Sequence, residues 1–373
     1  MGNVPNLRFP EFSGEWVTKS INDLAVVIGG GTPDTTVKSY WDGEIQWFTP
    51  SEIGKNKYVD SSLRTITEVG LNNSSAKLLP PNTILLSSRA TIGECSLSLR
   101  ECATNQGFQC LVSKKCNVDF LYYLIQTKKK DLIRKSCGST FLEISANEVR
   151  KIQVSVPSDV EQQKIAELLS LIDERIATQN KIIEDLKKLK SAIRKKVFVS
   201  LKEEHTECCE INQLLTYEQP TAYIVTNDEY STDTTLIPVL TANKGFVLGY
   251  TDEDFGIYQK GECIIFDDFT MDAKYVSFPF KVKSSAIKML TAKPNVNLRF
   301  MFEYLSYLEL KSEEHKRHYI SEIASLVVEL PSKEMQNKIA SLMTSLDNKL
   351  ALEENTSVRY EDEKQYLLSQ MFI

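Results

Sequence analysis

The chain has 373 residues, with 44 Lys and Arg against 50 Asp and Glu, and a formal net charge of −6. Hydrophobic residues make up 42% and charged residues 25%, which excludes a collagen, a disordered tail and a histone-like basic protein. The acidic sum argues mildly against nucleic acid as a partner. Residues 1–200, however, carry 27 basic and 22 acidic residues (net +5), which leaves 17 and 28 (net −11) for residues 201–373. The second half can face DNA only if its Lys and Arg gather on one face.

In chain order, the pattern predicts a globular segment over 1–157 and a long helix over 158–200. A second globular segment over 201–331 and a second long helix over 332–373 follow. Short β-rich runs between Gly, Pro, Asn and Asp residues, together with short helical runs, give both globular segments an α+β character. No basic-then-apolar leader and no long apolar run is present, and the eight cysteines form no CxxC pair, so we expect a cytoplasmic protein with reduced thiols.

An internal repeat underlies this plan. A shift of 174 positions places 148–199 on 322–373, with identities that include Gln162 on Gln336, Asp173 on Asp347 and Lys190 on Lys364. Both copies begin with Pro-Ser and contain no later Gly or Pro, as expected for one uninterrupted helix. About 40 residues of helix make a rod of roughly 60 Å.

The long helices carry heptad-spaced apolar residues, which indicates a coiled-coil seam. The pattern is regular in the first copy and weakens around residues 353–357 of the second. Because a lone helix would leave this stripe in water, we expect the two copies to pack against each other. The predicted seam residues are Ile165, Leu168, Ile172, Leu186 and Leu189 in the first helix and Ile339, Leu342, Leu346 and Leu367 in the second.

No motif indicates an active site. The run Gly29-Gly30-Gly31 lacks the spacing of a dinucleotide loop and is better interpreted as a turn or a close backbone approach. His315 and His318 have no third metal ligand at a diagnostic spacing, and no nucleophile elbow occurs. We therefore expect no catalytic residue, no metal site and no cofactor in this chain.

Basic and polar clusters recur in both halves, and their side chains are those that neutralise phosphates and read base edges. Any one cluster is more often a solvated surface, so their weight comes from occurring in both halves of a duplicated design. The candidate DNA-binding residues are Arg89, Asn105, Gln106, Lys135, Ser139 and Thr140 in the first half and Thr241, Asn243, Lys244, Lys283, Lys316, Arg317 and Tyr319 in the second.

The chain resembles the specificity subunit of type I restriction–modification systems over essentially its whole length. The matching stretches in the first half include Gly31-Thr32-Pro33, Tyr40-Trp41, Ala103 to Phe108, Gly138-Ser139-Thr140 and the Val156-Pro157-Ser158 start of the first long helix. In the second half they include Ile237 to Thr241 and Phe266 to Thr270. The second half departs from the pattern, with Arg317-His318-Tyr319 in place of the Gly-Ser-Thr motif.

The resemblance implies two target-recognition domains that each read half of an asymmetric, bipartite DNA site. It also implies that the long helices pack antiparallel as a spacer and dock methyltransferase and restriction subunits. S-adenosylmethionine-dependent methylation and ATP-driven cleavage would belong to those partners. Inserting one helical turn after Arg175 should then lengthen the tolerated gap between the half-sites without changing either one.

Two other functions remain open from the sequence. One is a coiled-coil scaffold that binds only protein, which would retain no DNA when partner subunits are supplied. The other is an autonomous DNA methyltransferase, which would need an [ND]-P-P-[FYW] element, and the nearest string, Pro80-Pro81-Asn82, has the wrong order.

Overall fold

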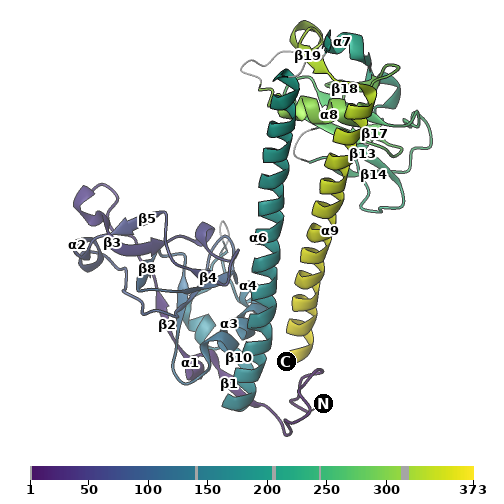
Figure 1. Cartoon of the computed structure of the whole chain (residues 1–373). Coiled ribbons are helices and arrows are strands. Elements are labelled where there is room, and N and C mark those ends of the chain that lie inside the picture. Colours follow the sequence, from purple (N-terminus) through teal and green to yellow (C-terminus); the bar gives the residue numbers. More distant parts are fainter. Residues whose placement is uncertain (1, 139–141, 204–206, 243–244, 312–318) are drawn as a thin grey trace. The chain divides into compact units, whose positions relative to one another are not determined.

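The computed structural model describes residues 2–138, 142–203, 207–242, 245–311 and 319–373 of a mixed α+β chain (Figure 1). The chain forms two compact units: unit 1 comprises Met1–Asn180 and Asn355–Ile373, and unit 2 comprises Lys181–Glu354. Each unit thus contains one globular segment and part of both long helices. The expected α+β class with long helices is confirmed.

Unit 1 contains a sheet of strand order β2-β9-β6-β7-β4, a sheet of order β5-β3-β8 and the antiparallel pair β1-β10. Their strands are β1 (Val17–Ser20), β2 (Ala25–Gly29), β3 (Trp41–Phe48), β4 (Tyr58–Val59), β5 (Arg64–Ile66), β6 (Ile84–Leu86), β7 (Cys95–Ser98), β8 (Cys102–Thr104), β9 (Gln109–Ser113) and β10 (Gln153–Val156). The α-helices before the first long helix are α1 (Ile21–Leu24), α2 (Glu68–Asn72), α3 (Val118–Thr127), α4 (Lys129–Arg134) and α5 (Ala146–Arg150). The long helices are α6 (Asp159–Glu203) and α9 (Lys333–Met371).

Unit 2 repeats this plan with a sheet of order β12-β18-β15-β16, a sheet of order β14-β13-β17 and the antiparallel pair β11-β19. Its strands are β11 (Glu207–Glu210), β12 (Leu215–Glu218), β13 (Ile237–Leu240), β14 (Val247–Thr251), β15 (Cys263–Asp267), β16 (Ala273–Val276), β17 (Lys281–Val282), β18 (Ile287–Ala292) and β19 (Val327–Leu330). Its shorter helices are α7 (Ile211–Leu214), α8 (Leu298–Tyr307) and the π-helical turn Tyr319–Ile323.

The end of α9 is part of the core of unit 1. Phe372 packs against Trp16 and Phe120, with ring centroids 6.4 and 5.3 Å away, and Leu368 and Met371 are buried in the same cluster. Phe198, which the repeat aligns with Phe372, packs in unit 2 against the aromatic residues of α8. Each helix therefore starts in one unit and ends in the core of the other, which is why the units do not follow the chain order.

A duplicated glutamine fixes the start of each long helix. The buried Gln162 accepts a hydrogen bond from the backbone amide of Asn117 (3.1 Å) and donates one to the carbonyl of Pro157 (3.0 Å). Gln336 makes the same pair of bonds with Asn297 (2.8 Å) and Pro331 (2.9 Å). Since Asn117 and Asn297 are the N-caps of α3 and α8, each glutamine joins a long helix to the short helix packed beside it.

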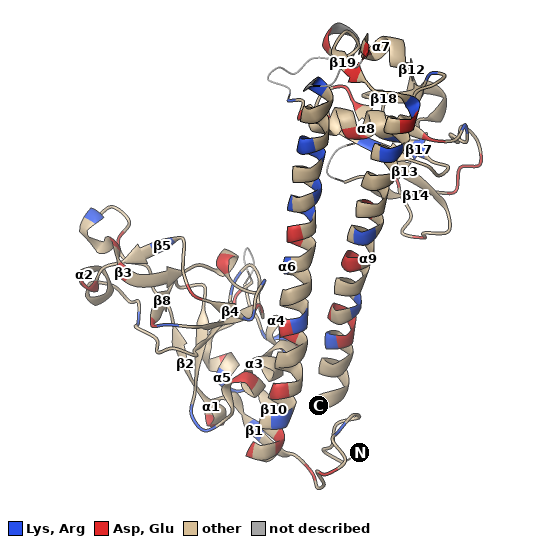
Figure 2. Cartoon of the chain, in the orientation of Figure 1, with Lys and Arg blue, Asp and Glu red and all other residues tan. Residues whose placement is uncertain are grey.

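Duplicated ion pairs set the antiparallel register of α6 and α9. In unit 1, Lys364 of α9 bonds Asp173 of α6 at 2.7 Å. In unit 2 the roles are exchanged, because Lys190 of α6 bonds Asp347 of α9. These residues are repeat partners of one another, so the repeat makes the same Lys–Asp contact once in each unit. The expected antiparallel packing is confirmed, and Figure 2 shows acids and bases interspersed along both helices.

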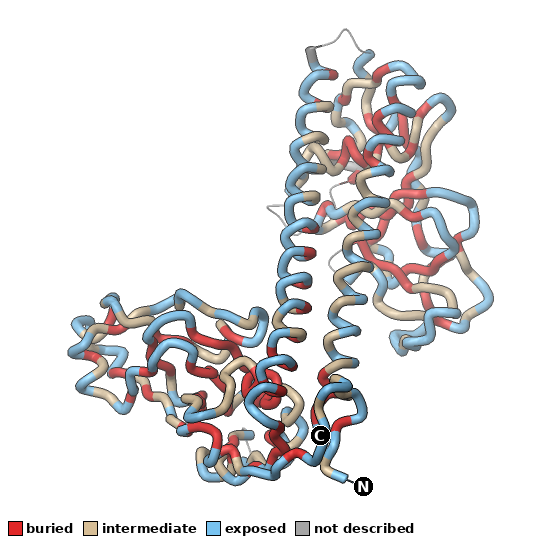
Figure 3. Tube along the Cα trace, turned by 60° about the horizontal axis from the view of Figure 1, so that its bottom comes forward, coloured by how far each residue is buried: buried red, intermediate tan, exposed pale blue. Residues whose placement is uncertain are grey.

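The helices bury most of the predicted seam residues but leave two of them exposed. Ile165 and Ile172 are buried, and Leu168, Leu186, Leu346 and Leu367 are half-buried, but Leu189 and Leu342 are exposed at 49% and 43%. In α6, Leu169, Ile176 and Ile183 are buried as well. Figure 3 shows buried positions recurring along the long helices. The seam placement of Leu189 and Leu342 was therefore wrong, because apolar residues on two adjacent flanks made either stripe compatible with the heptad.

We predict that Ile183→Ala destabilises unit 2 and that Leu189→Ala hardly does. Ile183 is 9% exposed and lies in the seam, so its truncation should cost about 2–4 kcal/mol. Leu189, on the same helix in the same unit, loses little because it is already 49% exposed. Differential scanning calorimetry of the two variants measures the contrast, and an equal fall in Tm would contradict the seam assigned to α6.

Candidate nucleic-acid interface

Arg89 lies on a tight turn that follows the buried strand β6. The turn is closed by backbone bonds between Ser87 and Glu94 (2.8 Å) and between Gly93 and Ser87 (3.1 Å). The hydroxyl of Ser87 also donates to the carbonyl of Arg89 at 2.8 Å. Ala90 has a φ of +55°, a left-handed conformation that is rare for a residue with a side chain. The backbone that presents Arg89 is thus tightly constrained, as is common at binding sites.

Ser88 joins the loops that carry the first-half candidates. Its backbone amide donates to the carbonyl of Gly107 (2.8 Å), and its carbonyl accepts from the amide of Ile144 (3.1 Å). The first bond holds the Asn105–Gln106 loop, which follows β8, and the second holds the segment that ends the Gly138-Ser139-Thr140 motif. The structure therefore brings Arg89, Asn105 and Gln106 onto adjacent loops at one end of the unit 1 sheets.

The glycine run supports this loop cluster through a close backbone approach, as expected from the sequence. The amide of Gly31 donates to the carbonyl of Thr104 (2.8 Å), and Thr32 donates from its hydroxyl to the side-chain oxygen of Gln106. A Cβ on Gly30 would overlap the carbonyl oxygen of Asn105, so only glycine permits the contact. The Asn105 side chain in turn accepts from the amide of Gly107 at 2.8 Å. Gln106 is exposed, and Asn105 is half-buried.

Arg64 is a further exposed cation near the glycine loop, and the sequence did not indicate it as a candidate contact residue. Its guanidinium lies 3.5 Å from the centroid of the Trp41 ring, a cation–π distance. The indole N–H groups of Trp41 and Trp47 donate to the carbonyls of Asp34 (3.1 Å) and Gly31 (2.9 Å), so the same aromatic pair steadies the glycine loop. Arg64 stands alone in the sequence, and only the position of β5 beside β3 brings it to the tryptophans.

The remaining candidates of the first half divide into two groups. Lys135 caps the C-terminus of α4 and is half-buried, where a cation interacts favourably with the helix dipole. Ser139 and Thr140 lie outside the described residues. Their flanks are described, however: Cys137 and Glu143 exchange backbone hydrogen bonds of 2.9 and 3.0 Å.

In the second half, the structure brings Thr241 and Lys283 together. Strands β13 and β17 run parallel, and these two residues follow their carboxyl ends. The amide of Lys283 donates to the carbonyl of Leu240 at 3.1 Å, which places the exposed lysine beside the β13 end. Thr241 itself is 7% exposed. Asn243, Lys244, Lys316 and Arg317 lie outside the described residues.

Tyr319 does not face solvent, which corrects its selection as a contact residue. Its side chain is 1% exposed and packs against Phe266 and Tyr217, and its amide donates to the carboxylate of Asp268 (2.7 Å). Burial raises the pKa of its hydroxyl to about 12. The tyrosine ring occupies a position in the apolar core. The basic residues that precede it in the sequence had suggested a surface position.

Two lysines of the second half are withdrawn from the surface by internal ion pairs. Lys281 is fully buried against Glu253 (2.5 Å), and Lys288 is 1% exposed against Asp268 (3.2 Å). Burial alone would raise the pKa of Glu253, but hydrogen bonds from Lys281 and Thr226 outweigh it and lower the pKa to about 2. These lysines cannot contribute to a basic face. The prediction that the Lys and Arg of residues 201–331 gather on one face therefore depends on the remaining cations.

Several of the cysteines are buried in the protein interior. Burial raises the pKa of Cys95, Cys110 and Cys263 to about 12, so these cysteines are neutral, unreactive core residues. Within the described ranges no group of three or more His, Cys, Asp or Glu could hold a metal ion. Among these same residues no helix is both long and apolar enough to cross a membrane.

Comparison with known proteins identifies the class. The family model of the type I restriction modification DNA specificity domain matches residues 13–188 and again residues 205–359, which together make up most of the chain. The chain therefore belongs to this family, and the two matches correspond to the two copies of the repeat. The resemblance drawn from the sequence motifs is confirmed.

Particular relatives carry the same assignment. A stretch of 216 residues is 37% identical to the specificity subunit of the type I restriction enzyme MjaIX of Methanocaldococcus jannaschii and covers 57% of this chain and 50% of that protein. Another of 142 residues is 41% identical to the Escherichia coli EcoR124I/EcoR124II specificity subunit, covering 36% and 35%. The chain thus aligns with half or less of these relatives.

The fold extends over the entire chain. The crystal structure of the type I restriction–modification S subunit from M. genitalium covers 99% of both chains with a TM-score of 0.63 at 17% identity. A second solved chain, from work on complex assembly and conformational transition of the type I R-M system, gives a TM-score of 0.59 at 13% identity. At these identities the two structures establish the shared fold.

We predict that Gly30→Ala displaces the Asn105–Gln106 loop. The added methyl group must push against the backbone of Asn105, and such overpacking costs about 1–3 kcal/mol. Gly29→Ala is the matched control, since its Cβ would meet only Gln109 at 3.7 Å. Calorimetry should show a lower Tm for the first variant alone, and equal values would contradict the close approach.

Proposed function

We propose that this chain is the non-catalytic, sequence-specific DNA-binding subunit of a type I restriction–modification complex. The observation that carries the proposal is the repetition of one plan in two units whose exposed loops differ, so that each unit offers its own reading surface. Two different surfaces would read an asymmetric, bipartite site. The proposed contacts are Arg64, Arg89, Asn105, Gln106, Lys135, Ser139 and Thr140 in the first unit and Thr241, Asn243, Lys244, Lys283, Lys316 and Arg317 in the second.

The first reading surface has the mixture of groups that sequence recognition needs. Arg89 can present two parallel donors to the O6 and N7 atoms of guanine, and Asn105 or Gln106 can pair with both donor and acceptor of adenine. Arg64 and Lys135 are suited to phosphates, which position a protein without specifying sequence. Because Ser88 ties the loops together, the reading groups would act as one rigid set.

The long helices are proposed to set the spacing between the half-sites. Helix α6 is a single helix of 45 residues without interruption, and the exchanged ion pairs fix its register against α9. Paired DNA-reading modules generally translate their separation into the distance between half-sites. The gap between the half-sites would then follow from helix length and not from the recognition loops.

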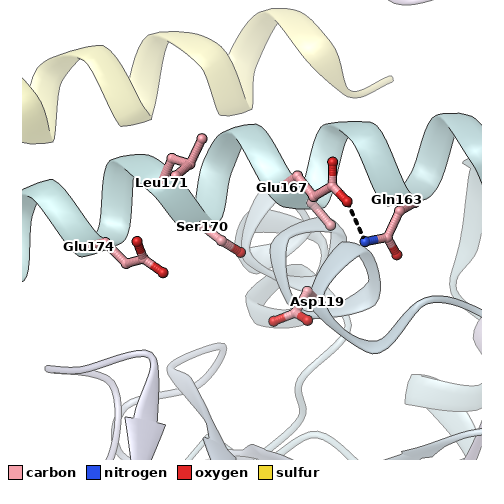
Figure 4. Close-up of a pocket in the computed structure, with 7 residues that line it drawn as sticks. Asp119, Gln163, Glu167, Ser170, Leu171 and Glu174 are labelled. Atoms are coloured by element: carbon pink, nitrogen blue, oxygen red, sulfur yellow. Dashed lines mark hydrogen bonds between the residues drawn. The ribbon is translucent and has the colours of Figure 1, made fainter.

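Helix α6 also presents a surface suited to a protein partner. In unit 1, Val160 and Leu171 are exposed and stand 11 residues apart, about three helical turns, so they share a face. Leu171 lines a pocket of about 350 Å³ together with Asp119, Glu167 and Glu174 (Figure 4). Exposed apolar side chains beside carboxylates fit a partner that offers apolar contacts and basic residues. We propose that this surface of α6 binds a methyltransferase subunit. The resulting complex would also bind the restriction subunit.

The complete complex is the direct test of the function. Co-expression with methyltransferase subunits of the same system, followed by base-resolution methylation mapping, should reveal adenines methylated within one bipartite, asymmetric sequence. A purely protein-binding scaffold would give a complex that retains no DNA and methylates nothing. An autonomous methyltransferase would methylate DNA without the partner subunits.

We predict that lengthening both helices lengthens the gap. The bond between Ser357 and Asn180 (2.9 Å) marks opposed positions, so seven residues inserted after Asn180 should be matched by seven after Thr356. One heptad preserves the seam and adds about 10 Å, roughly three base pairs. Methylation mapping that showed changed half-site bases with the original gap would refute the spacer role.

We predict that Arg89→Ala weakens recognition of the first half-site only. Losing a bidentate base contact should reduce discrimination at that half-site by about ten-fold or more. Gln106→Ala should act in the same direction. Binding of the assembled complex to duplexes altered in one half-site at a time measures the effect. Equal losses at both half-sites would show that these side chains act through general affinity or stability.

A further inference from the structure

The guanidinium of Arg89 is held by a neighbouring carboxylate. An Nη atom of Arg89 lies 2.8 Å from an Oε atom of Glu143, and the two residues also form a β-bridge through their backbones. The side chains are 42% and 37% exposed, so the pair stands at the surface and not in the core. The pairing is therefore accessible to a ligand that approaches the loop cluster.

Glu143 is itself fixed from two sides. Its amide and carbonyl are both bonded to the backbone of Cys137. The next residue, Ile144, donates its amide to the carbonyl of Ser88, the residue directly before Arg89. A carboxylate anchored in this way determines where the Arg89 side chain points. Since Ala90 fixes the turn on the other side, both the backbone and the head group of Arg89 are constrained.

We propose that Glu143 is a positioning residue that determines the specificity of the first half-site. The inference rests on the proposed DNA-reading role of Arg89. Arginine has five N–H donors, so the group can remain bonded to Glu143 and still offer two donors to a guanine edge. The pairing removes much of the side-chain freedom that binding would otherwise have to restrict.

The negative charge of Glu143 also acts against wrong sequences. An Arg89 released from its carboxylate can turn to the phosphates, which every DNA sequence offers. Where no guanine edge is present, Glu143 partly neutralises the charge of Arg89. Its own carboxylate then lies near the DNA phosphates and repels them. Specificity thus comes from stabilising the correct complex and penalising the others.

The test is Glu143→Gln in the assembled complex, using the cognate duplex and a duplex changed in the first half-site. We expect the ratio of the two affinities to fall by about ten-fold, with tighter binding to the changed duplex and weaker binding to the cognate one. In an Arg89→Ala background the same substitution should leave the ratio unchanged, because the partner it positions is gone. Glu143→Ala, which also removes the hydrogen-bond acceptor, should act at least as strongly.

Glu148→Gln is the matched control for loss of one charge. Glu148 is 36% exposed and pairs with Lys151 at 2.9 Å on helix α5, with no bond to the Arg89 turn. It should change the affinity of both duplexes equally and leave their ratio intact. If Glu143→Gln behaves as Glu148→Gln does, or if its effect on the ratio persists without Arg89, the positioning role is overturned.

The variants also separate this inference from the proposed function. If Arg89→Ala leaves the affinity ratio unchanged, Arg89 does not read the first half-site, and both the positioning role and that part of the proposed function fail. If Arg89→Ala lowers the ratio and Glu143→Gln does not, the reading role stands and the positioning role fails. A complex that binds neither duplex would contradict the proposed function as a whole.

Discussion

The antiparallel pairing of α6 with α9 is the constraint on which the rest of the structure depends. Two ion pairs, Lys364 with Asp173 and Lys190 with Asp347, define one register, and their members are exchanged by the internal repeat. In unit 2 the pair belongs to a larger network, in which the fully buried Glu303 also bonds Arg194 (2.8 Å) and Arg299 (2.7 Å). Carboxylates that are buried with several cations are costly to leave unpaired, so these contacts specify the arrangement strongly.

The globular parts are attached to this helix pair by equally duplicated contacts. Gln162 and Gln336 bond the capping residues of α3 and α8. Phe198 near the end of α6 packs in the core of unit 2, and Phe372 after α9 packs in the core of unit 1. Basic residues near the end of α6 form ion pairs within the helix scaffold, because Lys187, Lys190 and Arg194 all pair with acidic side chains. Positive charge along the helices therefore says little about DNA, and the reading groups must be sought on the loops.

The loops of unit 1, the proposed reading surface, are ordered although they consist of short polar segments. Gly30 allows two backbones to touch, Ser88 bonds neighbouring loops, and Glu143 holds the head group of Arg89. In each case the contact that orders the loop comes from a residue distant in sequence. Such an assembly combines exposure with order, which a base-reading side chain requires if wrong bases are to be rejected.

The duplication, the α+β class, the long helices and the family can all be predicted from the amino-acid sequence. These features depend on local periodicity and on residue identity at fixed spacing, both of which are present in the chain as written. The sequence did not determine which flank of α6 is buried, because Leu168 and Leu169, or Ile182 and Ile183, fit the heptad almost equally well. Nor did it separate exposed cations from buried ones: Lys281 and Lys283 differ by two positions, yet one is enclosed with Glu253 and the other faces solvent. The folded structure was needed for both distinctions, because the burial of a residue and its partners depend on strands and loops far apart in the chain.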